Sequence, residues 1–198
     1  TEQALEDIKK RVPVMLVEGG AFSEKEDSWL PVAGPDNYGM GKALAEELLK
    51  DYSGNADGKR FGILTEYSDS EALASRAEGF IDTVEKKGAE ISWFATDDFS
   101  ESGKDTLESL PKVDVVAALD DKSLRTAGKC SAANNLHGAL VYGIGHSTEA
   151  VYYLDTDKVQ CLVVPDEFQA GYQSLTQVAQ SLGHYFRSVK GQVVPHRA

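Results

Sequence analysis

The chain has 198 residues, of which 41% are hydrophobic and 26% are charged, a composition that is ordinary for a globular protein. Its formal net charge of −12, from 32 acidic and 20 basic residues, argues against direct nucleic-acid binding, because no excess of cations can replace counterions on phosphates. No apolar run is long enough to span a bilayer. Two cysteines, Cys130 and Cys161, are too few for a disulfide framework or a cysteine-based zinc site, and the four histidines lack metal-ligand spacing. We therefore predict neither a metal ion nor a cofactor.

The predicted elements alternate between helices and strands from the beginning of the sequence. An amphipathic helix over residues 4–10 precedes an apolar strand over 12–17, and Glu18 begins the turn that follows this strand. A second helix begins near residues 36–37 and carries its apolar residues on one face. The turn 53–58 (SGNADG) lies beyond its end.

Residues 60–80 contain the best-defined strand–helix unit. The apolar run 61–64 (FGIL) suits a buried strand, and a polar loop over 65–69 follows it. Ser70 is the predicted N-cap of a helix with apolar residues at helical spacing. Arg76 lies two turns into this helix, where its guanidinium could face a ligand beyond the strand end or could simply be solvated.

The second half of the sequence repeats this alternation. Strands are predicted over 89–94, 113–119, 139–144 and 160–164, and helices over a segment ending at Leu110, from residues 120–121 onward, over 148–154 and over 168–189. Successive strand–helix units indicate a parallel sheet with right-handed crossovers and helices on both faces. The predicted fold class is therefore α/β, with a Rossmann-like parallel sheet.

Several segments suggest nucleotide or hydrolase chemistry but lack the residues that this chemistry needs. Residues 34–43 (GPDNYGMGKA) resemble a phosphate loop, yet Asp36 stands where the spacing requires glycine and Ala43 replaces the magnesium-binding hydroxyl. Residues 143–145 (GIG) form half of a dinucleotide fingerprint, and Thr148 occupies the third glycine position. No G-x-S-x-G nucleophile elbow is present.

Two acidic pairs, at residues 97–98 and 120–121, lie at predicted strand ends or helix starts. Helix capping explains Asp120 and Asp121, because carboxylates near a helix N-terminus satisfy free amides and its positive pole. A catalytic acid pair is the alternative role for such residues. Without a complete catalytic constellation, we do not predict an enzyme.

Seven segments, taken in order, resemble the type I periplasmic binding proteins, of the ribose- and galactose-binding kind, and the related effector domains of LacI-type repressors. The segments are VPVMLVEGG, PVAGPDNYGMGKALAEELL, RAEGF, ATDDF, VVAALDD, VYGIGHS and VVPDEFQAGYQSL. The family fold has two α/β lobes that are joined by three crossings and close on a small ligand. The resemblance implies that residues 37–165 form a complete C-terminal lobe, and that 1–36 and 166–198 are the remnant of a truncated N-terminal lobe. Such a remnant would expose edge strands and an apolar face, which favours homodimerisation.

The resemblance also implies ligand-contact positions. Glu18 falls at an acidic position that accepts hydrogen bonds from sugar hydroxyls, and Arg76 falls on the ligand-binding arginine. Phe99 falls at an aromatic position suited to stacking on a sugar face. Tyr67 and Asp120 complete this part of the predicted ligand-binding set.

Three positions depart from the family pattern. Leu119, Gly145 and Pro165 stand where the family commonly has asparagine, aspartate, and glutamine or aspartate. Because each buried sugar hydroxyl left unpaired costs about 1–3 kcal/mol, these departures should weaken ordinary pentose or hexose recognition. His146 and Asp166 lie next to two of the gaps and are candidates to replace the missing groups. A more apolar ligand, an anionic ligand facing Arg76, or loss of the ligand are the alternatives.

The resemblance implies a solute-binding module of a bacterial ABC-type sugar transport or sensing system, which holds a sugar or a similar small molecule in an interlobe cleft. Its expected partner is a membrane transporter or sensor, and its expected location is periplasmic or extracellular. The alternative is the ligand-binding effector domain of a LacI-type repressor, which would be cytoplasmic.

Overall fold

The computed structural model describes residues 7–8, 11, 36–68, 70–96, 104–166, 171–172 and 175–176. The chain divides into two compact units, of which the larger contains Asp36–Pro165 and the smaller contains Thr1–Pro35 and Asp166–Val194. Every helix and strand whose bounds are given below lies in the larger unit.

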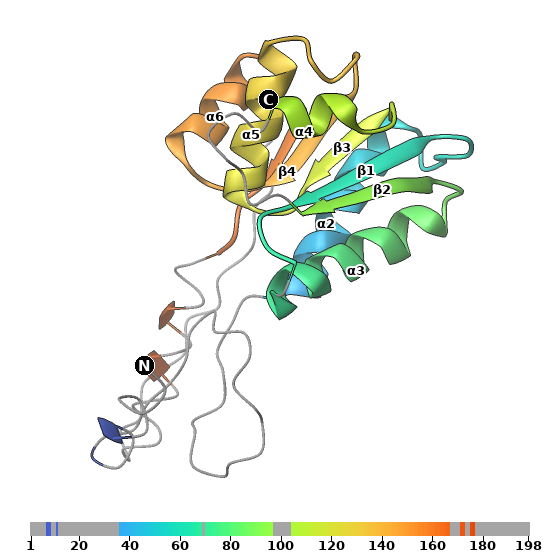
Figure 1. Ribbon diagram of the computed structural model, residues 1–198. Helices are drawn as coiled ribbons and strands as arrows, with labels where there is room; N and C mark the ends of the chain where they lie inside the picture. Colours follow the sequence, from blue (N-terminus) through green and yellow to red (C-terminus); the bar gives the residue numbers. More distant parts are fainter. Residues whose placement is uncertain are drawn as a thin grey trace. The chain divides into compact units, whose positions relative to one another are not determined.

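A five-stranded parallel sheet forms the centre of the larger unit (Figure 1). In chain order its strands are β1 (Arg60–Thr65), β2 (Glu90–Thr96), β3 (Val115–Ala118), β4 (Leu140–Ile144) and β5 (Cys161–Val163). In space the order is β2-β1-β3-β4-β5, with every neighbouring pair parallel. The chain therefore passes over β1 on its way from β2 to β3, and the strand order reverses between β1 and β3. Doubly wound sheets of this order bind ligands at the carboxyl ends of the strands next to such a reversal.

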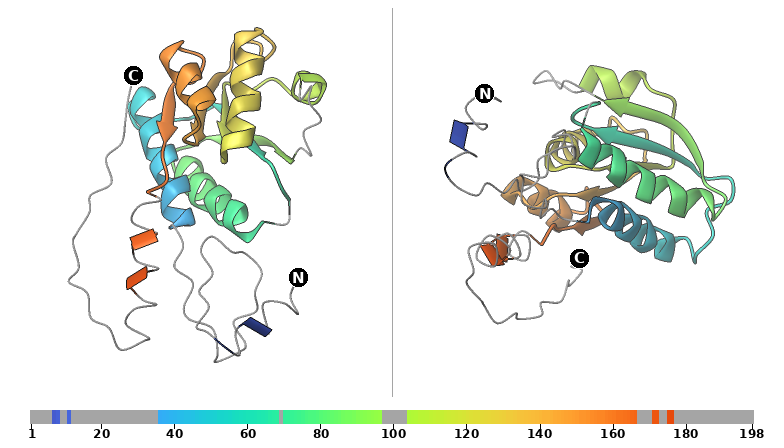
Figure 2. Two further views of the ribbon diagram at one scale, coloured as in Figure 1. Left: turned by 90° about the vertical axis from the view of Figure 1, so that its left-hand side faces the viewer. Right: turned by 90° about the horizontal axis from the view of Figure 1, so that it is seen from below.

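Helices cover both faces of the sheet (Figures 1 and 2). Two of them pack on one face, namely α2 (Asn37–Asp51) and α3 (Glu71–Glu85). The opposite face carries α4 (Lys104–Ser109), α5 (Asp121–Ala132) and α6 (Thr148–Asp155).

The two hydrophobic cores follow from the alternation of side chains along each strand. On β1, Phe61 and Ile63 are fully buried in the core beneath α2 and α3, whereas Leu64 belongs to the core beneath α5 and α6. Cys161 lies in the first core and Cys130 in the second, and both side chains are buried. The sheet thus separates the two cysteines.

Helices α2 and α3 cross closely because each has a glycine at the contact. A Cβ atom on Gly41 would lie 1.8 Å from the backbone oxygen of Arg76, and one on Gly79 would lie 2.1 Å from that of Tyr38. The Tyr38 hydroxyl also donates to Oδ2 of Asp82 at 3.0 Å. This packing sets the position of α3, and therefore of Arg76, relative to the start of α2.

The predicted α/β class with a parallel sheet is confirmed. Ser70 caps α3 as predicted, since its side chain accepts a hydrogen bond from the N–H of Leu73. Strand β2 continues to Thr96, two residues past the predicted end. Most residues of the predicted helix over 4–10 and of the predicted helix over 168–189, and all residues of the predicted strand over 12–17, lie outside the described residues. Within the described ranges, no helix is long and apolar enough to cross a membrane, and no cluster of three potential metal ligands occurs.

Candidate functional site

Four of the predicted site residues belong to the carboxyl edge of the sheet. Tyr67, Asp120 and His146 follow β1, β3 and β4, respectively, so their chain positions are neighbours in space. Arg76 reaches the same edge from α3, because its Nη1 donates to the backbone oxygen of Leu119 at 3.0 Å. The strand-order reversal between β1 and β3 lies within this group.

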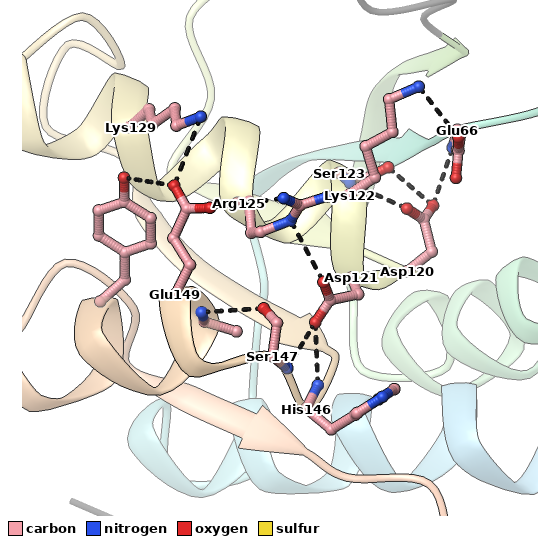
Figure 3. Close-up of polar contacts among 12 residues, drawn as sticks. Glu66, Asp120, Asp121, Lys122, Ser123, Arg125, Lys129, His146, Ser147 and Glu149 are labelled. Atoms are coloured by element: carbon pink, nitrogen blue, oxygen red, sulfur yellow. Dashed lines mark hydrogen bonds and ion pairs between the residues drawn. The ribbon is translucent and has the colours of Figure 1, made fainter.

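Asp120 links the loop after β1 to the start of α5. Its Oδ1 accepts from the N–H of Ser123 at 2.8 Å, which makes it the N-cap of α5 as predicted. Its Oδ2 accepts from the Ser123 hydroxyl at 2.7 Å and from the N–H of Glu66 at 2.8 Å (Figure 3). Both carboxylate oxygens are therefore engaged by protein donors across the strand-order reversal.

Asp121 makes the corresponding link between the start of α5 and the loop after β4. Its Oδ1 accepts from the N–H groups of His146 and Ser147 at 3.0 and 2.9 Å, and its Oδ2 forms an ion pair with Arg125 Nε at 3.2 Å (Figure 3). Partial burial opposes ionisation, but the amides of Ser147 and His146 and the Arg125 guanidinium hold the pKa of Asp121 below its ordinary value. The sequence indicated Asp121 as a helix-start residue or a member of an acid pair, but not its bonds to the loop after β4, because bonds of this range leave no local pattern.

Glu149 joins α5 to α6 behind this loop (Figure 3). Its carboxylate lies 3.4 Å from Arg125 Nη1 and 3.4 Å from Lys129 Nζ, and it accepts from the Tyr153 hydroxyl at 3.3 Å. The charged side chains of Arg125, Lys129 and Glu149 are partly exposed, so each ion pair contributes little on its own, about 0–1 kcal/mol. Together they place α6 against α5.

Glu66 and Lys122 form an ion pair at the same edge, with Lys122 Nζ 2.9 Å from Glu66 Oε1. Burial opposes ionisation of Glu66, but hydrogen bonds from Tyr67 and Lys122 hold the pKa of its carboxyl below the ordinary value. Sequence reasoning did not single out either residue of this pair. The position of Glu66 directly after a strand was the available signal, whereas nothing distinguished Lys122.

Arg76 is anchored in two directions. Its Nε donates to Oδ1 of Asn37 at 2.8 Å, and its Nη1 donates to Leu119 O. The guanidinium is therefore not a freely solvated helix group, which was one of the two alternatives left by the sequence. A direct ligand contact of Arg76 stays a prediction.

The structure also accounts for two of the departures from the family pattern. The Leu119 side chain is fully buried in the core beneath α2 and α3. Gly145 is buried as well, and a Cβ atom there would lie only 2.8 Å from Asp121 Oδ1. Asp166 is partly exposed in the smaller unit. The predicted contacts Glu18 and Phe99 lie outside the described residues.

A family model described as "Periplasmic binding protein domain" matches residues 1–184. The chain belongs to this family. The resemblance inferred from the seven ordered segments is therefore confirmed. No curated protein matches this periplasmic binding protein at a significant level.

Solved structures share the fold of this periplasmic binding protein. A glucose-galactose binding protein from Geobacillus stearothermophilus is 19% identical with a TM-score of 0.75, and the match covers 96% of this chain and 69% of that one. A carbohydrate transporter solute binding protein from Agrobacterium radiobacter, in complex with D-arabinose, is 21% identical with a TM-score of 0.76, covering 99% and 69%. A periplasmic sugar binding protein of an ABC sugar transporter from Legionella pneumophila is 20% identical with a TM-score of 0.74, covering 90% and 68%. At these identities the likeness establishes the fold.

Proposed function

We propose that this periplasmic binding protein binds a sugar or a sugar-like small molecule, without converting it, at the carboxyl ends of β1, β3 and β4. In this role it is the solute-binding component of an ABC-type transport or sensing system of the cell envelope. The observation that carries the proposal is the group of polar side chains, Tyr67, Arg76, Asp120 and His146, beside the strand-order reversal. This is where doubly wound sheets bind ligands, and the three relatives above are named for sugar or carbohydrate binding or transport.

The side chains at this edge divide into a framework and an accessible part. Asp120 and Asp121 hold the loops after β1 and β4, because their oxygens accept from backbone N–H groups of those loops. Tyr67 is 53% exposed, and His146 is exposed as well. An exposed tyrosine ring offers a flat apolar face, and an imidazole can donate or accept, both of which suit a polyhydroxylated ligand.

Binding rather than catalysis fits the state of the two carboxylates. A general acid needs a pKa near the working pH, whereas the pKa of Asp121 is held below its ordinary value. Asp120 already accepts three hydrogen bonds from Glu66 and Ser123. The acid pair that the sequence left open as catalytic is better explained as framework. The naming of the three relatives likewise favours transport over the repressor alternative.

The test is calorimetric titration of the 198-residue protein with D-glucose, D-galactose, D-arabinose and L-arabinose. We expect saturable binding of at least one sugar, and we expect His146→Ala and Tyr67→Ala to weaken it by about tenfold or more, equivalent to about 1.4 kcal/mol. Tyr152→Ala is the matched control, because Tyr152 is a 59% exposed tyrosine on α6, outside the loops that follow β1, β3 and β4. If none of the four sugars shows saturable binding, the proposal is contradicted.

A further inference from the structure

One carboxylate oxygen holds two consecutive amides of the loop between β4 and α6. Asp121 Oδ1 accepts from the N–H of His146 at 3.0 Å and from that of Ser147 at 2.9 Å (Figure 3). Hydrogen bonds to an ionised acceptor are about twice as strong as those between neutral groups. The preceding residue, Gly145, donates from its own N–H to the backbone oxygen of Val163 at 3.0 Å. The loop is thus held at three successive residues.

The carboxylate of Asp121 is itself fixed by both flanking helices. It lies on the first residue of α5, and its Oδ2 pairs with Arg125 one turn later at 3.2 Å. Arg125 in turn contacts Glu149 of α6 at 3.4 Å. On the loop side, Ser147 caps α6 by accepting from the N–H of Ala150 at 3.2 Å. Asp121 therefore acts between α5, α6 and the end of β4.

Gly145 is the residue that admits this carboxylate. A Cβ atom at position 145 would lie 2.8 Å from Asp121 Oδ1, 3.1 Å from Leu124 Cδ2 and 3.2 Å from Asp121 Cα. A side chain at 145 and the present position of Asp121 therefore exclude each other. The contact of Asp121 with the loop therefore depends on the absence of a side chain at Gly145.

This arrangement determines how His146 is oriented. Its side chain is exposed and points away from Asp121, whereas its backbone N–H is held by that residue (Figure 3). Because Asp121 fixes the backbone at His146, it also determines the direction in which the imidazole extends from the carboxyl edge of the sheet.

We propose that Asp121 is a positioning residue for ligand binding: without touching the ligand, it holds residues 145–147 in the conformation that presents His146 at the carboxyl edge of the sheet. The inference rests on the proposed sugar-binding function. It follows that the contribution of this loop to ligand affinity depends on Asp121, a residue of α5.

The test combines amide hydrogen exchange with calorimetry on the full 198-residue chain. In Asp121→Ala, we expect exchange at the His146 and Ser147 amides to accelerate by about tenfold or more, because a bond to a charged acceptor is lost. The Kd for the best-bound sugar of the four above is expected to rise by about tenfold or more. Asp121→Asn keeps an acceptor for the two amides but loses the ion pair with Arg125, so its values should be intermediate.

Asp51→Ala is the matched control. Asp51 also accepts a hydrogen bond, from the Tyr142 hydroxyl at 2.8 Å, but it lies at the end of α2 opposite to Asn37. We expect this variant to leave both the loop exchange and the Kd unchanged, even if it lowers stability. Gly145→Ala is a second variant that displaces the Asp121 carboxylate without removing its charge, and it should reproduce the effects of Asp121→Ala.

The outcomes separate this inference from the proposed function. If the wild-type chain binds none of the four sugars, the proposed function fails and the inference fails with it. If the wild type binds but Asp121→Ala and Gly145→Ala change neither the loop exchange nor the Kd, only the inference is overturned. Faster loop exchange with an unchanged Kd also overturns it, because Asp121 would then hold the loop for stability alone.

Discussion

Arg76 on α3 donates from Nε to Oδ1 of Asn37, the first residue of α2, although the two residues are 39 positions apart. The same guanidinium donates from Nη1 to the backbone oxygen of Leu119, directly after β3. A planar guanidinium can satisfy two acceptors in fixed directions, whereas an ammonium is a point charge with rotating donors. Arg76 therefore organises the carboxyl edge whether or not it also contacts a ligand.

Arg76→Lys should lower the free energy of unfolding by about 1–2 kcal/mol in the absence of ligand, because one or both hydrogen bonds are lost. Urea denaturation monitored by circular dichroism measures this change. The matched control is Arg60→Lys, at an exposed arginine at the start of β1, which should stay within about 0.5 kcal/mol of wild type. Unchanged stability together with lost sugar binding would show that Arg76 acts on the ligand alone.

Thr65→Val should leave stability unchanged or raise it by up to about 1 kcal/mol. Thr65 is fully buried at the end of β1, and its hydroxyl has no hydrogen-bond partner within the described part of the chain. Replacing this hydroxyl with a methyl group of similar size removes an unsatisfied polar atom. Thermal and urea unfolding both measure the effect.

Ser123→Ala is the contrasting variant for Thr65→Val. Ser123 is also fully buried, but its hydroxyl donates to Asp120 Oδ2 at 2.7 Å. Its removal should cost about 1–2 kcal/mol, since a hydrogen bond to a charged group is lost. Equal losses in both variants would contradict the assignment of Thr65 as unsatisfied.

Gly41→Ala and Gly79→Ala should each lower the free energy of unfolding by about 1–3 kcal/mol or more. The added Cβ atoms would lie 1.8 and 2.1 Å from backbone oxygens of the facing helix, so α2 and α3 would have to move apart. Denaturant midpoints compared with Glu46→Ala, on the exposed side of α2, measure the effect. Wild-type stability in both glycine variants would mean that this helix contact tolerates separation.

Stability should fall at acidic pH partly through Asp121. Its folded pKa lies below the ordinary value of about 3.9, so the folded state binds its proton more weakly than the unfolded chain does. The stabilisation is therefore fully present above the unfolded pKa and is lost as the pH falls through the folded pKa. Urea midpoints between pH 7 and the lowest pH at which the protein stays folded should decrease less in Asp121→Asn than in wild type. If the urea midpoints of the two proteins decrease equally as the pH falls, Asp121 does not contribute to the loss of stability at acidic pH.

The helix starts show how far local patterns reach. Ser70 and Asp120 were readable as N-caps, because each side chain bonds an N–H only three residues ahead. The second function of Asp120, its bond to the N–H of Glu66 across 54 residues, has no counterpart in such a pattern. Glu66 and Lys122 were missed for the same reason, since their contact depends on β1 and β3 lying side by side.

The sequence by itself determined the alternation of strands and helices, the α/β class and the resemblance to periplasmic binding proteins. These features depend on residue types within a few positions of one another and on the order of short segments. Only the tertiary structure decided that β3 lies beside β1, that Arg76 joins α2 to the end of β3, and that Asp121 holds the loop after β4. The physical reason is that these contacts join residues 25 to 54 positions apart, so they exist only after the crossovers and the close packing of the helices have brought their partners together.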